Sequence, residues 1–301
     1  MFRHRTGPLT LRRVADEHQQ LPYDHISLTP IGATLGARVD AIDIATITGE
    51  ECAELDRALL EHKLLVFRDQ HITREQHARF AARFGALVDD QLVLRQSPDP
   101  VDNMVEFTRD ATVLAYENEW HTDGTFRPVP PLATVLRALD VPEVGGDTLF
   151  ADMAAAFDNL DDDLRARVTT LTAIHDWSIG AYADKYGEGL VELRELVPPV
   201  EHPVVIRHPR TGRPTLFVNR LFTREIVGLA PAEGDALLDL LCRQAELPEL
   251  QCRVHWEPGT VAFWDNVAVQ HYGANDYFPQ VRTMARAAIA GDPTAWPALP
   301  V

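Results

Sequence analysis

A histidine and a carboxylate stand two residues apart in residues 120–126, Trp-His-Thr-Asp-Gly-Thr-Phe. In an extended backbone, side chains i and i+2 point to the same side, so His121 and Asp123 could bind one metal ion together. We expect the third ligand to be His271, in the stretch Gln-His-Tyr-Gly. Two histidines and one carboxylate on one face of a metal, with the other positions open, is the arrangement of non-haem Fe(II) oxygenases.

Each of these residues also has an ordinary explanation. A chain of this composition contains about one histidine–x–aspartate pair by chance, and a hydrogen-bonded histidine in a surface turn would account for His121. His271 ends an apolar segment, where a buried and hydrogen-bonded core histidine is the common case. The metal interpretation therefore depends on further residues.

Two arginines follow His271 in the last predicted strand. Arg282 and Arg286, with Met284 between them, share one face of an extended strand, and the sequence leaves open whether that face points inward. Inward guanidiniums would need an anion, which a dicarboxylate co-substrate would supply bidentately. Thr148, after a Gly-Gly-Asp turn, could bond the same carboxylate. The alternatives are a solvated strand face, pairing with protein carboxylates, and an ordinary β-turn.

Composition limits the classes of partner. The formal net charge is −17, from 28 basic and 45 acidic residues, which argues against binding nucleic acid or anionic lipid. We expect a small-molecule substrate and no nucleic-acid or membrane partner, and a homo-oligomer is left open. Three cysteines, the absence of an 18-residue apolar run and the absence of a signal-peptide pattern predict a cytoplasmic protein without a disulfide framework.

The elements expected around these residues form one domain. Two capping boxes, beginning at Thr48 and Thr73, predict helices over residues 49–63 and 74–85. Residues 86–119 and 178–195 are predicted to be irregular, and the first segment is long enough for a lid. A loose extension over residues 1–24 and a single catalytic domain over 25–301, with a β core and outer helices, are expected. The other predicted elements are strands over 64–67, 135–139, 203–206, 215–218, 260–264, 267–271 and 281–289, and helices over 151–168 and 231–247.

A series of ordered motifs extends this pattern over residues 26–293. They include His-Lys-Leu-Leu-Val-Phe-Arg-Asp-Gln at 62–70, Arg-Phe-Gly at 83–85, the heptad at 120–126, Gly-Gly-Asp-Thr at 145–148, His-Pro-Arg-Thr-Gly-Arg at 208–213 and Trp-Asp-Asn at 264–266. With these motifs, the chain resembles the taurine dioxygenase family of Fe(II)/2-oxoglutarate-dependent dioxygenases. The resemblance implies a mostly β, α+β fold with flanking helices, built as a double-stranded β-helix (jelly-roll) barrel.

The resemblance also implies roles for individual residues. Fe(II) would be bound by His121, Asp123 and His271, and O2 would be the oxidant. The distal carboxylate of the co-substrate 2-oxoglutarate would be held by Thr148 and Arg282. Arg286 would lie near the other end of the co-substrate and near the primary substrate.

Departures from the taurine enzymes concern the substrate. After the Phe-Gly motif, where those enzymes have a histidine and a tyrosine, this chain has Asp90 and Val93. Their asparagine before Trp-His is replaced by Glu117, and their valine after the ligand aspartate is replaced by Gly124. Arg286 then predicts an anionic group on the substrate. Asp90 and Glu117 predict an amine or hydroxyl on it, because unpaired buried acids are costly. Gly124 predicts extra space above the metal. The alternative is that both acids face solvent.

The predicted function is thus C–H oxidation of a small anionic or amino-acid-like substrate other than taurine, with release of succinate and CO2. One alternative is the same chemistry on an alkylsulfonate, a sulfate ester or an aryloxyacid. Others are a non-catalytic iron and 2-oxoglutarate sensor, and a hydrolase or isomerase that uses another divalent ion. Desaturation and cyclisation are also left open.

Overall fold

The computed structural model describes residues 22–88, 103–113, 117–178 and 194–296 of the 301-residue chain. Asp90, Val93, nearly all of the predicted extension over 1–24 and most of the predicted loop over 178–195 lie outside the described residues, as does much of the predicted lid. The division into an extension and a domain over 25–301 stays a prediction.

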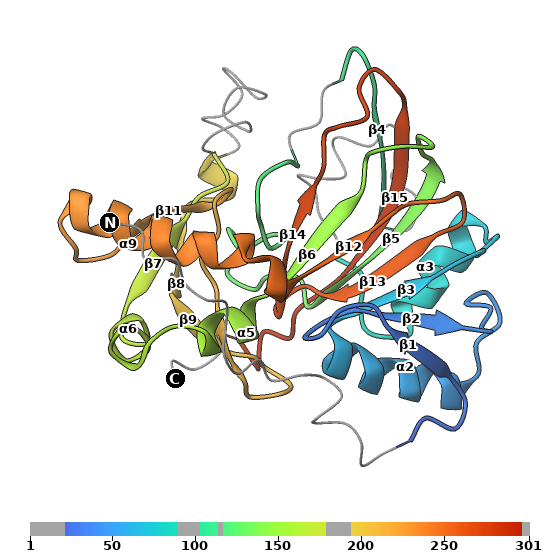
Figure 1. Cartoon of the computed structure of the whole chain (residues 1–301), viewed down its shortest axis with the longest axis horizontal. Coiled ribbons are helices and arrows are strands. Elements are labelled where there is room, and N and C mark those ends of the chain that lie inside the picture. Colours follow the sequence, from blue (N-terminus) through green and yellow to red (C-terminus); the bar gives the residue numbers. More distant parts are fainter. Residues whose placement is uncertain (1–21, 89–102, 114–116, 179–193, 297–301) are drawn as a thin grey trace.

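A seven-stranded sheet is the largest element of the fold (Figure 1). Neighbouring strands are antiparallel except β2 and β3, which are parallel. In spatial order the strands are β1 (Ser27–Pro30), β2 (Ala37–Asp40), β3 (Leu64–Phe67), β13 (Val261–Asp265), β5 (Ala133–Asp140), β15 (Arg282–Ile289) and β4 (Met104–Arg109). From β3 onward, strands from the first half of the chain therefore alternate with strands from its end.

A three-stranded sheet packs on the inner face of the large one. It consists of β12 (Gln251–Val254), β6 (Thr148–Asp152) and β14 (Val269–Gly273). The apolar core between the two sheets draws from both, and its buried members include Leu136, Phe150, Trp264, Val269 and Met284. Two facing and mainly antiparallel sheets around a shared core confirm the predicted double-stranded β-helix, which the comparisons below also support.

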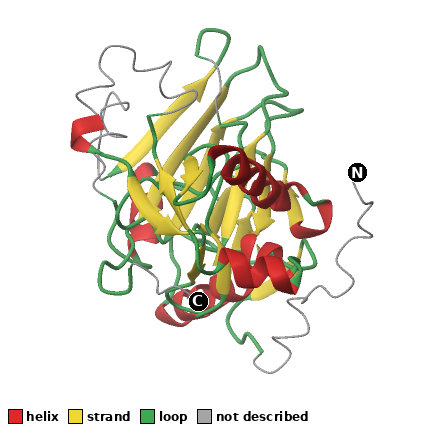
Figure 2. Ribbon diagram, turned by 90° about the vertical axis from the view of Figure 1, so that its left-hand side faces the viewer, coloured by secondary structure: helices red, strands yellow, loops and turns green. Residues whose placement is uncertain are grey.

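Two helices pack on the outer face of the large sheet, on the right in Figure 1, and Figure 2 shows the molecule from its left-hand side with the helices in red. Helices α2 (Gly49–His62) and α3 (Arg74–Ala82) begin at Thr48 and Thr73, and both capping boxes predicted from the sequence are present. Leu55, Leu59 and Phe80 pack from these helices against the back of the sheet. The apolar face of each helix therefore packs on the sheet, and together they form a second apolar core on its outer face.

The remaining elements form a smaller layer beyond the three-stranded sheet, on the left in Figure 1. They are α5 (Met153–Asp158), α6 (Asp162–Val168), α9 (Pro231–Cys242), the 3-10 helices η2 (Arg243–Glu246) and η3 (Pro248–Leu250), the sheet β11 (Thr223–Ile226), β7 (Thr172–His175) and β8 (Val200–Pro203), and the hairpin β9 (Val205–Arg207) and β10 (Pro214–Leu216). Among the described residues, none of the helices has the length and apolar character needed to cross a membrane. Cys52, Cys242 and Cys252 are free thiols.

Two predictions of elements are wrong. The predicted single helix over 151–168 is divided, because Asp152 ends β6 and caps α5, and Asp161 then caps α6. The segment 86–119, predicted to be irregular, contains β4 at the edge of the large sheet. The inward face of β4 includes both Phe107 and Arg109, so the alternation of apolar and polar residues that marks a strand is weak there.

Candidate metal centre and active site

His121 and His271 are brought together by their own backbones. The amide of His121 donates to the carbonyl of His271 at 3.0 Å, and the amide of His271 donates to the carbonyl of His121 at 2.8 Å. In an antiparallel pair of this kind the two side chains project to the same side, and the imidazole centroids are 4.1 Å apart. His271 comes from β14, so a strand of the small sheet fixes the position of the heptad.

Asp123 is positioned by Asn266, in the turn between β13 and β14. The Asn266 side chain accepts a hydrogen bond from the Asp123 amide at 3.0 Å and donates to the Asp123 carbonyl at 2.9 Å. It also donates to the carbonyl of Pro131 at 2.9 Å, and Asn266 is fully buried. Asn266 thus hydrogen-bonds both the amide and the carbonyl of Asp123, which fixes the backbone from which the carboxylate extends.

The three predicted ligands converge. Asp123 Oδ1 lies 3.6 Å from His121 Nε2 and 3.8 Å from His271 Nε2, and one donor atom from each residue lies within 4.8 Å of the others. His121 Nδ1 donates to the carbonyl of Glu119 at 2.7 Å, so Nε2 carries the lone pair that faces the centre. Two imidazole nitrogens and one carboxylate oxygen suit a divalent ion such as Fe(II).

Electrostatics keep these residues in the form that binds metal. Burial by itself would raise the pKa of Asp123, but Arg286, His271 and His121 together hold that pKa well below its usual range. Burial, and after it the neighbouring His121, lower the pKa of His271 to about 3. At neutral pH, Asp123 is therefore ionised and His271 is neutral, as metal binding requires.

The arginine face of β15 points inward. Met284 packs in the core between the two sheets, while Ala285 and Ala287 pack on the helix side. Arg282 and Arg286 share the face of Met284, so both guanidiniums enter the interior, and the open question from the sequence is answered.

Arg282 contacts only neutral acceptors among the described residues. Its Nε donates to the carbonyl of Gly146 at 3.1 Å and its Nη2 to Thr148 Oγ1 at 3.4 Å, while its side chain is buried. Burial is the largest cause that lowers the pKa of Arg282, and it outweighs the opposing effects of Tyr277 and Glu117. Thr148 Oγ1 also accepts from the indole of Trp256 at 3.0 Å, which leaves the hydrogen of the Thr148 hydroxyl available to a ligand.

Arg286 has a different neighbour. Its Nη1 lies 3.2 Å from Asp123 Oδ2, whereas Asp123 Oδ1 faces the two histidines. The two carboxylate oxygens are therefore divided between a guanidinium and the predicted metal position. Aromatic rings border this position as well: the ring of Phe222 lies 6.1 Å from that of His121, and Phe126 packs on Phe222 at 4.9 Å.

Two residues predicted to shape the substrate site have other surroundings in the structure. Glu117 accepts hydrogen bonds from Arg109 Nε at 3.3 Å and, more closely, from Arg109 Nη2, so its charge is already neutralised. Gly124 has φ +66°, and a Cβ there would meet Pro131 Cδ at 2.8 Å. Its missing side chain therefore faces Pro131, and the positive φ alone favours glycine.

The sequence reasoning missed Arg109 as a site residue, because β4 was not recognised. Its position directly opposite Arg282 follows only from the pairing of β4 with β15. Asn266 had appeared only as part of a motif, and its two hydrogen bonds to Asp123 could not be inferred from residues 143 positions away.

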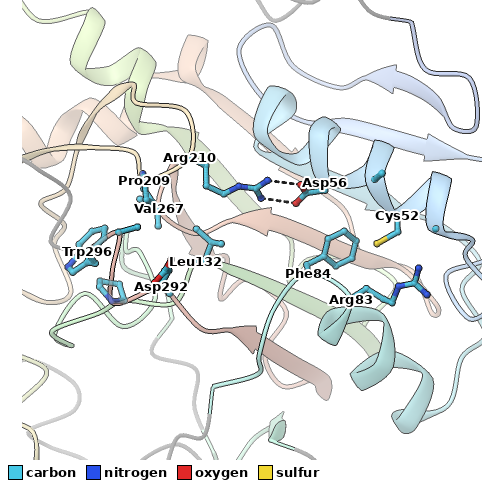
Figure 3. A pocket seen from close by; sticks show the side chains of 15 residues that line it. Cys52, Asp56, Arg83, Phe84, Leu132, Pro209, Arg210, Val267, Asp292 and Trp296 are labelled. Atoms are coloured by element: carbon cyan, nitrogen blue, oxygen red, sulfur yellow. Dashed lines mark hydrogen bonds and ion pairs between the residues drawn. The ribbon is translucent and has the colours of Figure 1, made fainter.

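A separate cavity of about 710 Å³ lies against the N-terminal half of α2, beside the β9–β10 turn and the segment that follows β15 (Figure 3). Phe84 and Trp296 stand on opposite sides of it. On its wall Arg210 donates to both carboxylate oxygens of Asp56, at 2.7 and 2.6 Å. None of the three converging residues lines this cavity, so it is not the metal centre.

Comparison with known proteins gives a consistent result. The model of the taurine catabolism dioxygenase TauD, TfdA family matches residues 27–288. The chain is 38% identical over 289 residues to an (S)-phenoxypropionate/alpha-ketoglutarate-dioxygenase of Sphingobium herbicidovorans, covering 90% of this chain and 97% of that protein. It is 33% identical over 284 residues to an alkylsulfatase of Acinetobacter baylyi, covering 91% of this chain and 88% of that protein.

Solved structures agree with these sequence matches. A taurine dioxygenase from Burkholderia xenovorans superposes with a TM-score of 0.77 and 34% identity, covering 90% of this chain and 92% of that one. AAD-2, solved in complex with Mn(II) and N-oxalylglycine, superposes with a TM-score of 0.75 and 30% identity, covering 89% of this chain and 98% of that one.

Proposed function

Because this chain belongs to the taurine catabolism dioxygenase TauD, TfdA family, we propose that it is an Fe(II)- and 2-oxoglutarate-dependent dioxygenase that oxidises a C–H bond of a small organic anion. The observation that carries the proposal is the meeting of two histidines and an aspartate in a site whose wall also presents Arg282, a buried cation that has only neutral acceptors among the described residues. When bound, Fe(II) and 2-oxoglutarate supply the oxidation: O2 and 2-oxoglutarate are converted to succinate and CO2 as one oxygen atom enters the substrate C–H bond.

The residues of the chain have three tasks in this reaction. His121 and His271 would hold the ion through Nε2, and Asp123 through Oδ1. Arg282 and the Thr148 hydroxyl would bind the distal carboxylate of 2-oxoglutarate, because one supplies the charge and the other a free hydrogen. No residue needs to act as a general acid or base.

The substrate is proposed to carry its anionic group toward Arg286, whose guanidinium borders the metal position. Phe222 and Phe126 offer an apolar surface beside His121 for the body of the substrate. An aryloxyalkanoate satisfies both features, and two relatives are named as phenoxypropionate dioxygenases. The predicted amine-binding role of Glu117 has less support, since Arg109 already neutralises its charge.

An alkyl sulfate ester is the second candidate. It also places an anion on Arg286 and an apolar chain against the rings, and relatives are named as an alkylsulfatase and a sulfate ester dioxygenase. The cytoplasmic location stays a prediction, and so does the homo-oligomer that the sequence leaves open.

The test is succinate release and O2 consumption over a panel of 2-aryloxypropionates, alkyl sulfates and amino acids. We expect turnover that needs both Fe(II) and 2-oxoglutarate, with aryloxy acids or alkyl sulfates well above the rate without substrate. If only amino acids increased succinate release, the substrate would instead be amino-acid-like. Failure of the protein to bind 2-oxoglutarate in the presence of metal would refute the dioxygenase proposal itself.

A further inference from the structure

Two buried arginines lie side by side at the co-substrate end of the site. Arg109 on β4 is directly opposite Arg282 on β15, so their side chains share one face of the sheet. Each is 8% exposed. Arg109 holds the carboxylate of Glu117 through Nε and Nη2, whereas Arg282 donates to the Gly146 carbonyl and the Thr148 hydroxyl. Among the described residues, Arg109 is therefore hydrogen-bonded to a carboxylate and Arg282 is not.

Glu117 is anchored close to both arginines. Its carbonyl accepts a hydrogen bond from the Gly273 amide at 2.9 Å, and Gly273 is directly opposite Thr148 in the small sheet. A Cβ on Gly273 would lie only 3.4 Å from the Cβ of Glu117, so glycine lets this segment approach. Thr148 in turn contacts Arg282. Glu117 therefore stands over the strand pair that presents the proposed binding site of the distal carboxylate.

This arrangement contains an internal competitor for the co-substrate. A buried guanidinium gains from any carboxylate that reaches it, and a side chain of the same protein acts at a high effective concentration. If Glu117 turned to Arg282, its oxygens would occupy the donors that 2-oxoglutarate needs. The paired donors of Arg109 match a carboxylate bidentately and hold Glu117 in place.

We propose that Arg109 is a positioning residue that binds Glu117 and thereby keeps Arg282 open for the co-substrate. The inference rests on the proposed function, because it takes Arg282 as the site of the distal carboxylate. Arg109 does not itself touch 2-oxoglutarate in this account, and its effect passes entirely through Glu117. The side chain of Glu117 is therefore harmful to co-substrate binding only when Arg109 is absent.

The test compares Arg109→Met, Glu117→Gln and the double variant, each loaded with Mn(II) and titrated calorimetrically with 2-oxoglutarate. We expect Arg109→Met to raise the Kd for 2-oxoglutarate by about 10- to 100-fold, because Glu117 then moves to Arg282. The double variant should return to within about threefold of the wild type, since the competitor is gone. Steady-state assays should show a raised KM for 2-oxoglutarate with kcat little changed at saturation.

Arg74→Met is the matched control. Arg74 also pairs with a glutamate of β4, Glu106, at 3.2 Å, but on the face of the strand that points away from the site. Its loss should leave the Kd for 2-oxoglutarate unchanged. A far-ultraviolet spectrum and a melting curve for each variant verify that it is folded.

Several outcomes would overturn the inference. One is an Arg109→Met variant that binds 2-oxoglutarate as the wild type does. Another is a double variant that remains as weak as the single one, which would mean that Arg109 contacts the co-substrate directly. If Arg109→Met does not fold, Glu117→Gln alone decides, because a Kd that stays equal or falls supports the inference and a Kd that rises more than about threefold contradicts it. A wild-type protein that binds no 2-oxoglutarate would instead refute the proposed function.

Discussion

Arg282 and Arg286 lie on the same face of β15, four residues and about 13 Å apart along the strand. Arg286 has a resident carboxylate, Asp123 Oδ2, at 3.2 Å. Arg282 has two neutral acceptors, and among the described residues it forms no ion pair. From this difference we infer that Arg286 would help to hold Asp123 at the proposed metal centre, whereas Arg282 would remain available to an anionic co-substrate.

Removing the carboxylate of Asp123 breaks the comparison most severely. In Asp123→Asn, Arg286 loses its ion-pair partner and the proposed centre loses a ligand. We therefore expect metal affinity to fall by more than about 100-fold, a larger loss than is typical when a residue that only hydrogen-bonds to a ligand is replaced. Turnover should be abolished. Metal titration of this variant, with Asp110→Asn as the control, measures the effect, because Asp110 is a partly exposed aspartate in the turn after β4. An Asp123→Asn variant with near-normal affinity would remove Asp123 from the ligand set.

Replacing Arg282 tests the proposed anion site. Arg282→Met should raise the Kd for 2-oxoglutarate by roughly 100-fold, because charge-assisted hydrogen bonds contribute about 1.5–3 kcal/mol each. Affinity for the metal should stay near that of the wild type, since Arg282 contacts Gly146 and Thr148 and not the converging ligands. Calorimetric titration with 2-oxoglutarate and with Mn(II) separates the two quantities. Equal weakening of both would mean that Arg282 supports the centre as a whole.

The sequence predicted the chemistry of this site better than its geometry. His121, Asp123 and His271 could be named because two histidines and one carboxylate form a known donor set, and the arginine pair because buried guanidiniums need anions. The capping boxes at Thr48 and Thr73 were equally readable, since local hydrogen bonds determine them.

What the sequence did not reveal depends on contacts between distant segments. The mutual hydrogen bonds of His121 and His271 join residues 150 positions apart, and Arg109 lies opposite Arg282 only because β4 pairs with β15. The inward face of β15 could not be chosen either, because its opposite face is equally compatible with burial. Gly124 was assigned to substrate space, although its φ and its neighbour Pro131 explain it.

The two arginines should also affect the stability of the metal-free protein in opposite directions. Arg282→Met replaces a buried cation by an apolar side chain of similar length, which is neutral or stabilising by about 1–2 kcal/mol. Arg286→Met removes a partner of buried Asp123 and should destabilise by about 1–3 kcal/mol, less than a fully buried pair because the Arg286 side chain is 23% exposed. Urea denaturation at pH 7 measures both, and the same sign for both variants would contradict the comparison.

The smallest expected effect is a pH dependence in the loss of stability caused by Arg286→Met, which Arg282→Met should not show. Burial raises the pKa of Asp123, and Arg286 is the strongest influence that lowers it, so Arg286→Met raises this pKa. A depressed carboxyl pKa stabilises the fold fully above its ordinary value of about 3.9 and loses that contribution as the pH falls through the folded pKa.

The stability gap between the wild type and Arg286→Met should therefore be complete at pH 6 and narrow by about 1 kcal/mol as the pH falls below about 4. Metal-free protein unfolded in urea at pH 6, 5, 4 and 3.5 gives this gap directly. The gap between the wild type and Arg282→Met should stay constant over the same range, because Arg282 pairs with no carboxylate among the described residues. If both gaps changed alike, the acid sensitivity would come from the fold in general, and the ion pair of Arg286 with Asp123 would not be its source.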